Sequence, residues 1–272
     1  MVERRGLLAR LCPLFSGSSG NSIYIGSGET GILIDVGRSA KQLEKAIKRC
    51  EIDLNIIKAI FITHEHADHI KGLRVFASRY GIDVYSSKGT LEAMKLKGNI
   101  LCDKFCSKVI AKEGMYINDI FIKPFSTSHD SKESLGYIVN TSDGRKITIA
   151  TDIGYISDEV REAINGCDLL FIESNHDVNM LKNGPYPYYL KRRILSDKGH
   201  LSNEACSKEL PKFAKNGTTR FILAHLSGEN NFPELAYQTA LNSFMTEGLI
   251  EGIDFELSVA PKENITGKSL IF

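Results

Sequence analysis

Three histidines and an aspartate fall within six consecutive positions, in the run His64-Glu65-His66-Ala67-Asp68-His69. The apolar stretch 59–62 precedes this run, and apolar residues at helical spacing follow over 70–80. The run is therefore predicted to form a turn at the carboxyl end of a strand, where open α/β sheets bind their ligands. Imidazoles and a carboxylate gathered there predict a divalent metal. A solvated polar loop is the alternative, but three protonated histidines so close together would repel one another.

The same pattern recurs three times further along the chain. His129, Asp152 and His225 each come just after an apolar stretch that is predicted as a strand. Strand ends on one edge of a sheet converge in space although they lie far apart in sequence. Five of the seven histidines belong to this set. A single histidine after a strand is usually structural, but several together favour a shared site.

Seven candidate ligands exceed what one tetrahedral ion needs, and they suit two ions that share a bridging group. One ion is predicted to be held by His64, His66 and His129. The other is predicted to be held by Asp68, His69 and His225, with Asp152 as the bridge. Two such ions hold a hydroxide between them and polarise the substrate oxygen, so that no protein nucleophile is needed. These ligand types suit zinc or manganese, with iron as a further candidate.

The composition is that of a globular protein and excludes a strong overall electrostatic field. The chain has 272 residues, of which 42% are hydrophobic and 25% charged, and its formal net charge is +1. Any contact with nucleic acid must therefore come from a local basic patch. The six cysteines are scattered and are predicted to be reduced and mostly buried. Reduced thiols predict a cytoplasmic protein. No signal peptide and no apolar run of bilayer length is recognised.

Strands lead both halves of the chain and helices lie between them, with no linker that would separate two domains. The predicted strands cover residues 7–15, 21–25, 31–35, 59–62, 84–85, 115–117, 120–125, 135–139, 146–150, 168–172, 220–224 and 255–259. Helices are predicted after the capping residues Ser39, Ser157 and Ser202 and over 91–97, 177–182, 188–195 and 233–247. This order predicts an α/β protein with a single domain over residues 1–272, in which two sheets pack face to face in a four-layer αββα sandwich.

The H-x-H-x-D-H run, taken with His129, Asp152 and His225, resembles the metallo-β-lactamase fold superfamily over essentially the whole chain. Two positions depart from other branches of that superfamily. Asp152 stands where many true lactamases have a cysteine, and His66 stands where the diiron redox branch usually has a glutamate. Both departures favour hydrolysis of phosphodiesters or thioesters.

Further strings resemble the YycJ (WalJ) family of exonuclease-like metallohydrolases. They are Phe15-Ser16-Gly17-Ser18-Ser19-Gly20-Asn21-Ser22, Glu173-Ser174-Asn175-His176-Asp177, Gly199-His200-Leu201-Ser202-Asn203 and Ala224-His225-Leu226-Ser227. A similar glutamate and histidine assist departure of the leaving group in tRNase Z. The resemblance therefore implies that Glu173 orients His200 as a general acid, and that His200, Glu173 and Asp68 are catalytic. Without it, His200 and Glu173 would read as a loop histidine and a surface acid.

Three segments are candidates for binding substrate. The glycine-rich segment with Ser18, Ser19 and Asn21 presents backbone N–H groups to a phosphate, or is simply a tight turn beside the site. Asn175 and His176 either contact substrate or only begin a helix. Tyr186, Lys191 and Arg192 belong to a stretch that interleaves aromatic and basic residues, as surfaces that bind single strands do, although an ordinary amphipathic helix has the same pattern.

The sequence thus predicts a two-metal phosphodiesterase, an exonuclease whose hydroxide attacks phosphorus and whose partner is a single-stranded end of nucleic acid. The alternative is a small-molecule hydrolase, either a thioesterase of the glyoxalase II kind or a cyclic-nucleotide phosphodiesterase. A catalytically idle metal-binding regulator is disfavoured because the ligand set is complete. DNA and RNA, both polarities of cleavage and any oligomeric state are compatible with the sequence.

Overall fold

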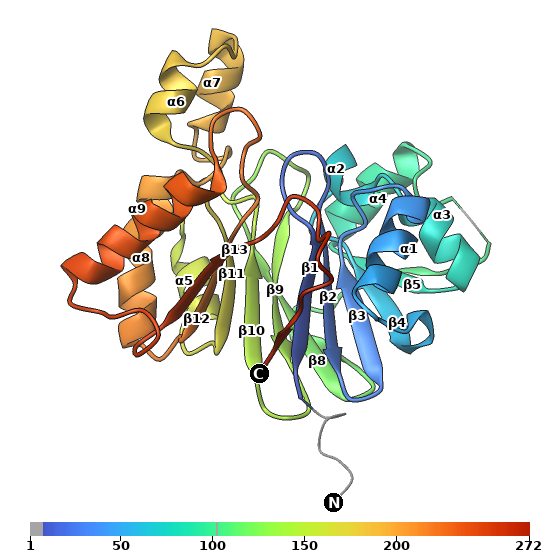
Figure 1. The fold of residues 1–272 in the computed structure, drawn as a ribbon. Helices are drawn as coiled ribbons and strands as arrows, with labels where there is room; N and C mark the ends of the chain where they lie inside the picture. Colours follow the sequence, from blue (N-terminus) through green and yellow to red (C-terminus); the bar gives the residue numbers. More distant parts are fainter. Residues whose placement is uncertain (1–7, 102) are drawn as a thin grey trace, which may run out of the picture. The chain divides into compact units, whose positions relative to one another are not determined.

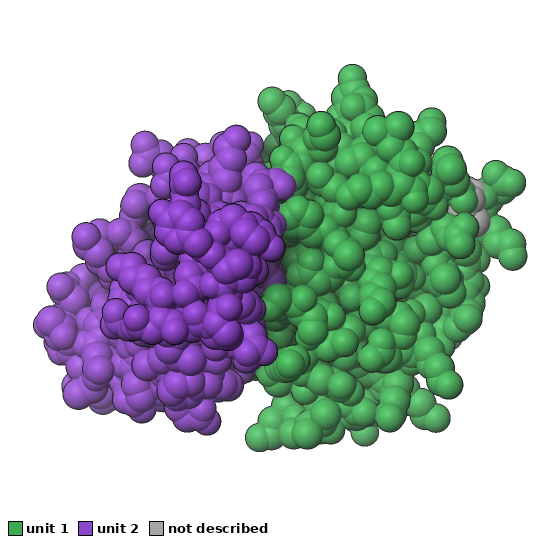
Figure 2. Space-filling model, turned by 90° about the horizontal axis from the view of Figure 1, so that it is seen from above, with its two compact units in different colours: residues 1–124, 131–145, 261–272 green, residues 125–130, 146–260 purple. Residues whose placement is uncertain are grey.

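The computed structural model describes residues 8–101 and 103–272, and the chain divides into two compact units. The first contains residues 1–124, 131–145 and 261–272, and the second contains residues 125–130 and 146–260; Figure 2 colours them separately. The expectation of a single domain stays a prediction. Within the described residues, no helix has both the length and the apolar character needed to cross a membrane.

The first unit is built on a seven-stranded mixed sheet (Figure 1). Its order is β14-β1-β2-β3-β4-β5-β6. The strands are β1 (Arg10–Phe15), β2 (Ser22–Ser27), β3 (Thr30–Ile34), β4 (Ile57–Phe61), β5 (Asp83–Ser86), β6 (Ser107–Val109) and β14 (Leu270–Ile271). β1, β2 and β3 pair antiparallel, whereas β3 to β6 run parallel, so their carboxyl ends share one edge. β6 and β14 are only three and two residues long and are not predicted from the sequence.

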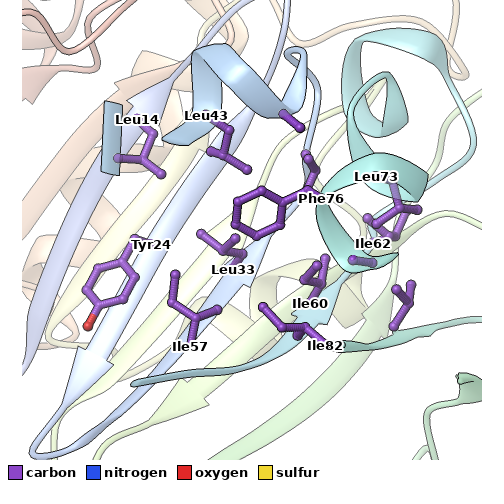
Figure 3. Close-up of a cluster of buried hydrophobic side chains, with 14 of the residues drawn as sticks. Leu14, Tyr24, Leu33, Leu43, Ile57, Ile60, Ile62, Leu73, Phe76 and Ile82 are labelled. Atoms are coloured by element: carbon purple, nitrogen blue, oxygen red, sulfur yellow. The ribbon is translucent and has the colours of Figure 1, made fainter. Parts of the chain in front are cut away.

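Helices cover one face of this sheet and enclose its apolar core. They are α1 (Ala40–Arg49), the 3-10 turn η2 (Leu54–Ile56), α2 (Ala67–Ile70), α3 (Leu73–Tyr80) and α4 (Lys88–Leu96). Ser39 caps α1 as predicted, and Gln42 completes a capping box. Figure 3 shows Leu43 of α1 and Phe76 of α3 pointing toward Leu33 of β3. All three side chains are buried, and each such burial contributes about 1.5–3 kcal/mol.

Three strands of the middle of the chain form part of a second sheet layer. They are β7 (Met115–Ile117), β8 (Ile120–Ser126) and β9 (Leu135–Asn140), in the order β9-β8-β7, and the last two residues of β8 belong to the second unit. The buried hydroxyl of Tyr137 on β9 donates to the carbonyl of Ile62, just beyond β4, at 2.7 Å. Two sheet layers therefore pack together inside the first unit.

The second unit contains four neighbouring parallel strands with helices beside them. The strands are β10 (Lys146–Ala150), β11 (Leu169–Glu173), β12 (Arg220–Ala224) and β13 (Glu256–Val259). The helices are α5 (Asp158–Ile164), α6 (Val178–Asn183), α7 (Tyr188–Ile194), α8 (Asn203–Lys215) and α9 (Pro233–Thr246). Ser157 and Ser202 cap α5 and α8 as predicted. The two sheets are mixed and flanked by helices, which confirms the α/β class.

The described cysteines agree with the expectation of reduced, mostly buried thiols. Cys12, Cys50, Cys167 and Cys206 are free and buried, and Cys106 is free and exposed. Cys102 lies outside the described residues.

Candidate metal and catalytic site

The H-x-H-x-D-H run lies where the sequence predicts, in the turn after β4. His66 is the N-cap of α2, and Asp68 and His69 lie on α2, so a short helix presents both. The predicted single helix over 70–80 is in fact two, because α2 ends at Ile70 and α3 begins at Leu73. The His64 ring centroid lies 4.5 Å from that of His66 and 4.1 Å from that of His69. The four side chains of the run therefore gather at one strand end of the first unit.

Asp35, which was not predicted from the sequence, accepts hydrogen bonds from this cluster. Nδ1 of His69 donates to Asp35 Oδ2 at 2.7 Å, and the backbone N–H and hydroxyl of Thr63 each donate to the carboxylate at 2.9 Å. Burial raises the pKa of Asp35 above its usual value, although His69 opposes this shift. The signal was available, since Asp35 directly follows the apolar strand β3, as the recognised residues follow theirs.

The glycine-rich segment forms a turn that is bonded to the same cluster. Asn21 N–H donates to the carbonyl of Asp68 at 2.8 Å, and its Nδ2 lies 3.3 Å from Asp68 Oδ2 and 3.0 Å from His69 Nε2. Gly37 allows this approach, because a Cβ there would lie 1.7 Å from the Asp68 carbonyl oxygen. Asn21 is buried, whereas Ser18 is exposed and Ser19 half-buried. The turn therefore holds Asp68 and His69, and phosphate binding by its serines or its backbone N–H groups stays a prediction.

In the second unit, Glu173 at the end of β11 joins two histidines. Its Oε1 accepts hydrogen bonds from Nδ1 of His200 and Nδ1 of His225, both at 2.8 Å. Its Oε2 accepts from the backbone N–H groups of Ile153 at 2.8 Å and Leu201 at 3.2 Å. The predicted contact between Glu173 and His200 is therefore present, and the bond to His225 is an addition to it.

The electrostatic setting keeps Glu173 ionised. Burial raises its pKa, but His200 and His225 outweigh burial and hold the pKa well below its usual range. Asp152 Oδ1 lies 3.3 Å from His225 Nδ1 and 3.8 Å from His200 Nδ1. One donor atom each from Asp152, Glu173, His200 and His225 lies within 4.8 Å of the others. His200 is thus a candidate ligand by position as well as a candidate acid.

A short turn ties His200 both to a predicted ligand and to α7. Nδ1 of His129 donates to the carbonyl of Gly199 at 3.1 Å. The backbone N–H of His200 donates to the carbonyl of Ile194, the last residue of α7, at 3.0 Å. A hollow of about 480 Å³ opens beside His129. It is lined by Ser126, Thr127, Ser128, His129, Tyr155, Ser157, Asp158, Glu159 and Lys198.

Asn175 and His176, which were predicted to contact substrate, are buried. Nδ2 of Asn175 donates to the backbone carbonyl of His225 at 2.8 Å, so this side chain holds the turn that carries a predicted ligand. The His176 ring is 1% exposed, and neither ring nitrogen has a hydrogen-bond partner among the described residues. Burial lowers the pKa of His176 to about 4. Direct contact with substrate would require either side chain to leave its place, and that role stays a prediction.

The tyrosine-rich basic segment lies in the turn before α7 and in α7 itself; we call residues 178–198, which contain α6, α7 and the turns after each, the arm. Figure 1 draws α6 and α7 side by side. The arm has five basic residues and one acidic residue, in a chain whose net charge is +1. Tyr188 and Tyr189 are each 75% exposed, and the Arg192 guanidinium lies 5.9 Å from the Tyr188 ring centroid. Lys191 Nζ donates to the carbonyl of Lys182 at 2.8 Å, so Lys191 also joins α7 to α6.

Three of the polar residues that follow strands share an unusual backbone conformation. Asp35, Asp152 and His225 have φ of 62°, 55° and 55°, in the left-handed region that residues other than glycine rarely adopt. Each directly follows or nearly follows a parallel strand, β3, β10 or β12. Such strain persists only where the surrounding structure holds it, and it is typical of functional sites.

The donor chemistry fits metal ions. Nδ1 of His69, His129 and His225 is bonded to an oxygen of the chain, and Nδ1 of His64 lies 3.0 Å from Thr63 Oγ1. The Thr63 hydroxyl donates to Asp35, so it accepts from His64. These contacts favour the tautomer with the proton on Nδ1, which makes Nε2 the coordinating atom, as second-sphere oxygens do in metal sites. That the seven residues form one site stays a prediction.

Comparison with known proteins gives matches over most of the chain. A family model described as beta-lactamase superfamily domain matches residues 30–226. The chain is 40% identical to exodeoxyribonuclease YycJ of Bacillus anthracis over 247 residues, covering 90% of this chain and 92% of that protein. It is 38% identical to exodeoxyribonuclease WalJ of Streptococcus pneumoniae, covering 90% and 91%. The crystal structure of the metallo-beta-lactamase fold protein YhfI from Bacillus subtilis has a TM-score of 0.68 at 14% identity and covers 97% of this chain and all of that one.

Proposed function

The chain belongs to the β-lactamase superfamily, and on that premise we propose that it is a metal-dependent exonuclease that hydrolyses phosphodiester bonds of DNA. The names of the relatives at 38–40% identity support a nuclease and favour DNA. They do not favour the thioesterase or cyclic-nucleotide phosphodiesterase. The structural observation that carries the proposal is the pair of 2.8 Å bonds from His200 and His225 to Glu173. They join a candidate acid to a candidate ligand.

Two divalent ions are proposed, held by the seven residues in the predicted division. His64, His66 and His129 would take one ion, Asp68, His69 and His225 the other, and Asp152 both. When bound, such ions supply an activated water and a Lewis acid for the phosphate. The bonded Nδ1 atoms of the histidines support this assignment, and the ligand types suit zinc or manganese, with iron as a further candidate.

His200 is proposed as the general acid and Glu173 as the group that orients it. Because Nδ1 of His200 is bonded to Glu173, its Nε2 is the nitrogen left to face a departing oxygen. The His200 side chain is 15% exposed, compared with 2% for His225, so it is the more accessible of the two. A 3′ or 5′ sugar oxygen is a poor leaving group, and a proton from His200 would assist its departure.

The arm is proposed to bind the single-stranded end of the substrate. Exposed tyrosines stack on bases without regard to sequence, and basic side chains beside them contact phosphates. Arg192 would contact a phosphate, and Tyr186, which is half-buried, would stack on a base beside the exposed Tyr188 and Tyr189. Lys191 would contribute less, since its ammonium group is already bonded within the arm.

A panel of labelled DNA and RNA, single- and double-stranded and with either end blocked, tests the proposal under several metals. We expect stepwise release of nucleotides from DNA with one free end, and loss of activity when that end is blocked. A thioester and a cyclic nucleotide serve as comparison substrates. Turnover of either without cleavage of any polynucleotide would refute the nuclease. The cytoplasmic location and the oligomeric state stay predictions.

A further inference from the structure

Arg38 is a partly buried cation in the first unit whose charge no carboxylate neutralises. It lies between β3 and α1, next to Ser39, the cap of α1. Among the described residues no carboxylate oxygen lies within 4 Å of its guanidinium, unlike Arg49 and Arg79, which contact Glu263 and Glu44. Taking a cation partly out of water without an anionic partner is unfavourable. An arginine in this position is therefore suited to an anion that the chain itself does not provide.

The surroundings hold the Arg38 side chain in one place. Its Nη2 donates to Ser19 Oγ at 2.8 Å, and its Cζ lies 5.6 Å from the Phe15 ring centroid. Its stem crosses Gly20, where a Cβ would lie 2.7 Å from Cδ of Arg38. Nε is buried and has no hydrogen-bond partner among the described residues. The side chain is ordered in advance, which lowers the entropic cost of binding a ligand.

The same turn places Arg38 beside the metal-binding run. Ser19 stands two residues before Asn21, whose backbone and side chain contact Asp68 and His69. The Arg38 carbonyl also packs on the α2–α3 junction, since a Cβ on Gly72 would lie 2.0 Å from it. All of the residues that make these contacts belong to the first unit. Arg38 is thus fixed, through its side chain and its backbone, next to two predicted ligands.

We propose that Arg38 is a substrate-binding residue whose guanidinium takes a phosphate oxygen of the polynucleotide at the Asp68–His69 end of the site. A planar guanidinium matches the oxygens of a phosphate, and Ser18, exposed on the same turn, offers a further donor. In the proposed function Asp68 would be a metal ligand, so its carboxylate would not be available to neutralise Arg38. This inference rests on the proposed function and adds a phosphate contact to it.

The test compares Arg38→Met with Arg74→Met in the metal-loaded enzyme. Arg74 is an exposed arginine on α3 of the same unit, so both variants lose one positive charge. Arg38→Met should raise KM for a single-stranded DNA, and its Kd by fluorescence anisotropy, by roughly 10- to 100-fold, the loss expected for one charge-assisted hydrogen bond. The salt dependence of binding should fall by about one phosphate contact. Arg74→Met should behave as the parent, and metal content should be unchanged in both.

A scan with single methylphosphonate linkages, which carry no charge, locates the contact. At one position, the methylphosphonate should weaken binding of the oligonucleotide to the parent. The same substitution should have no effect on binding to Arg38→Met. Arg38→Lys, which keeps the charge but not the planar fork, should lie between the two and serves if the methionine variant does not fold. If the parent cleaves DNA and both Arg38 variants keep its KM and its scan profile, Arg38 is structural and this inference is overturned. If the parent neither binds nor cleaves any polynucleotide, the proposed function falls and the inference falls with it.

Discussion

Nδ1 of His69 donates a 2.7 Å hydrogen bond to the carboxylate of Asp35, and both side chains are buried. The second unit repeats this arrangement, since Nδ1 of His225 donates to Glu173 at 2.8 Å. In both cases the carboxylate lies at the end of a parallel strand, β3 or β11. The chain therefore uses one device twice to fix a histidine's tautomer and to aim Nε2.

Asp35→Asn tests this device in the first unit. Both Thr63 and His69 donate to Asp35, so an amide must turn its NH₂ toward a donor whichever way it faces. Metal affinity should fall about 10- to 100-fold, measured by competition with a chromogenic chelator. Asp53→Asn, an exposed acid that caps η2, is the matched control and should bind metal as the parent does. Unchanged affinity in Asp35→Asn would show that the bond does not support the ligand.

Asp152→Ala tests for two ions. If Asp152 bridges them, its loss should lower both occupancies, and elemental analysis of the metal-replete protein should fall from two ions per chain toward none. Other contacts of the remaining ligands could retain part of one ion. The control is Asp158→Ala, which removes an exposed acid from the first turn of α5 and should leave the metal content equal to that of the parent. A parent that binds no more than one ion would contradict the bridging assignment.

Removal of positive charge from α7 tests the arm. Lys191→Ala combined with Arg192→Ala should weaken binding of a single-stranded oligonucleotide and flatten its salt dependence. Hydrolysis of a small chromogenic phosphodiester should hardly change. Arg192→Ala alone should show part of the effect without loosening α6 from α7, since the bond to Lys182 belongs to Lys191. The same exchange at Lys208 and Lys212, exposed on α8, is the control for net charge. Equal losses of activity on the oligonucleotide and on the small phosphodiester would show that the arm has a structural role.

The sequence predicts those site residues whose type and position are hard to explain except by a functional role. Polar residues that end apolar strands located the H-x-H-x-D-H run, Asp152 and His225, because a strand's end can be recognised from hydrophobicity alone. Asp35 follows the same rule but is not distinctive, since an isolated aspartate after a strand is also common in turns. Residue type could not reveal that Asn175 bonds the carbonyl of His225, because this contact joins strand ends far apart in sequence.

Burial of individual polar side chains was the other property that sequence did not show. His176 was predicted to face substrate, yet its ring is almost fully buried, because the turn after β11 packs against Ser202 and Asn203. Arg38 likewise gave no signal, as only the folded turn brings Ser19 and Phe15 around it. Short edge strands such as β6 and β14 are not predicted, because two or three residues are too few to show the alternation of apolar and polar residues that marks a strand.

His176 should make the protein less stable in acid. Burial lowers its pKa to about 4 in the folded chain, whereas an unfolded histidine titrates near 6.5. Between these values the unfolded state binds more protons than the folded state. The contribution of His176 to the free energy of unfolding is therefore fully present above about pH 6.5, and up to about 3 kcal/mol of it is lost as the pH falls toward 4. His176→Phe should flatten this decline in urea unfolding, and its ring forfeits no hydrogen bond to the described residues. Chelator in both samples removes the effect of metal release, and identical slopes would disprove the prediction.

His200→Ala separates the general acid from a ligand or a structural residue. Departure of a sugar oxygen places negative charge on it, and a proton from His200 relieves that charge. Cleavage of DNA should therefore slow by about 10²- to 10⁴-fold. His200→Asn should behave alike, although its amide can still donate to Glu173 and keep the bond from His225 to Glu173 in place.

The choice of leaving group makes this test decisive. A nitrophenyl ester departs without a proton, so both His200 variants should hydrolyse it nearly as fast as the parent if His200 is the acid. Loss of metal from either variant would instead make His200 a ligand, as its place among Asp152, Glu173 and His225 allows. Equal losses on DNA and on the nitrophenyl ester, with metal retained, would assign His200 to binding or structure. Only a loss confined to the poor leaving group, with the Kd for DNA unchanged, supports proton donation, because DNA differs from the small ester in its binding contacts as well as in its leaving group.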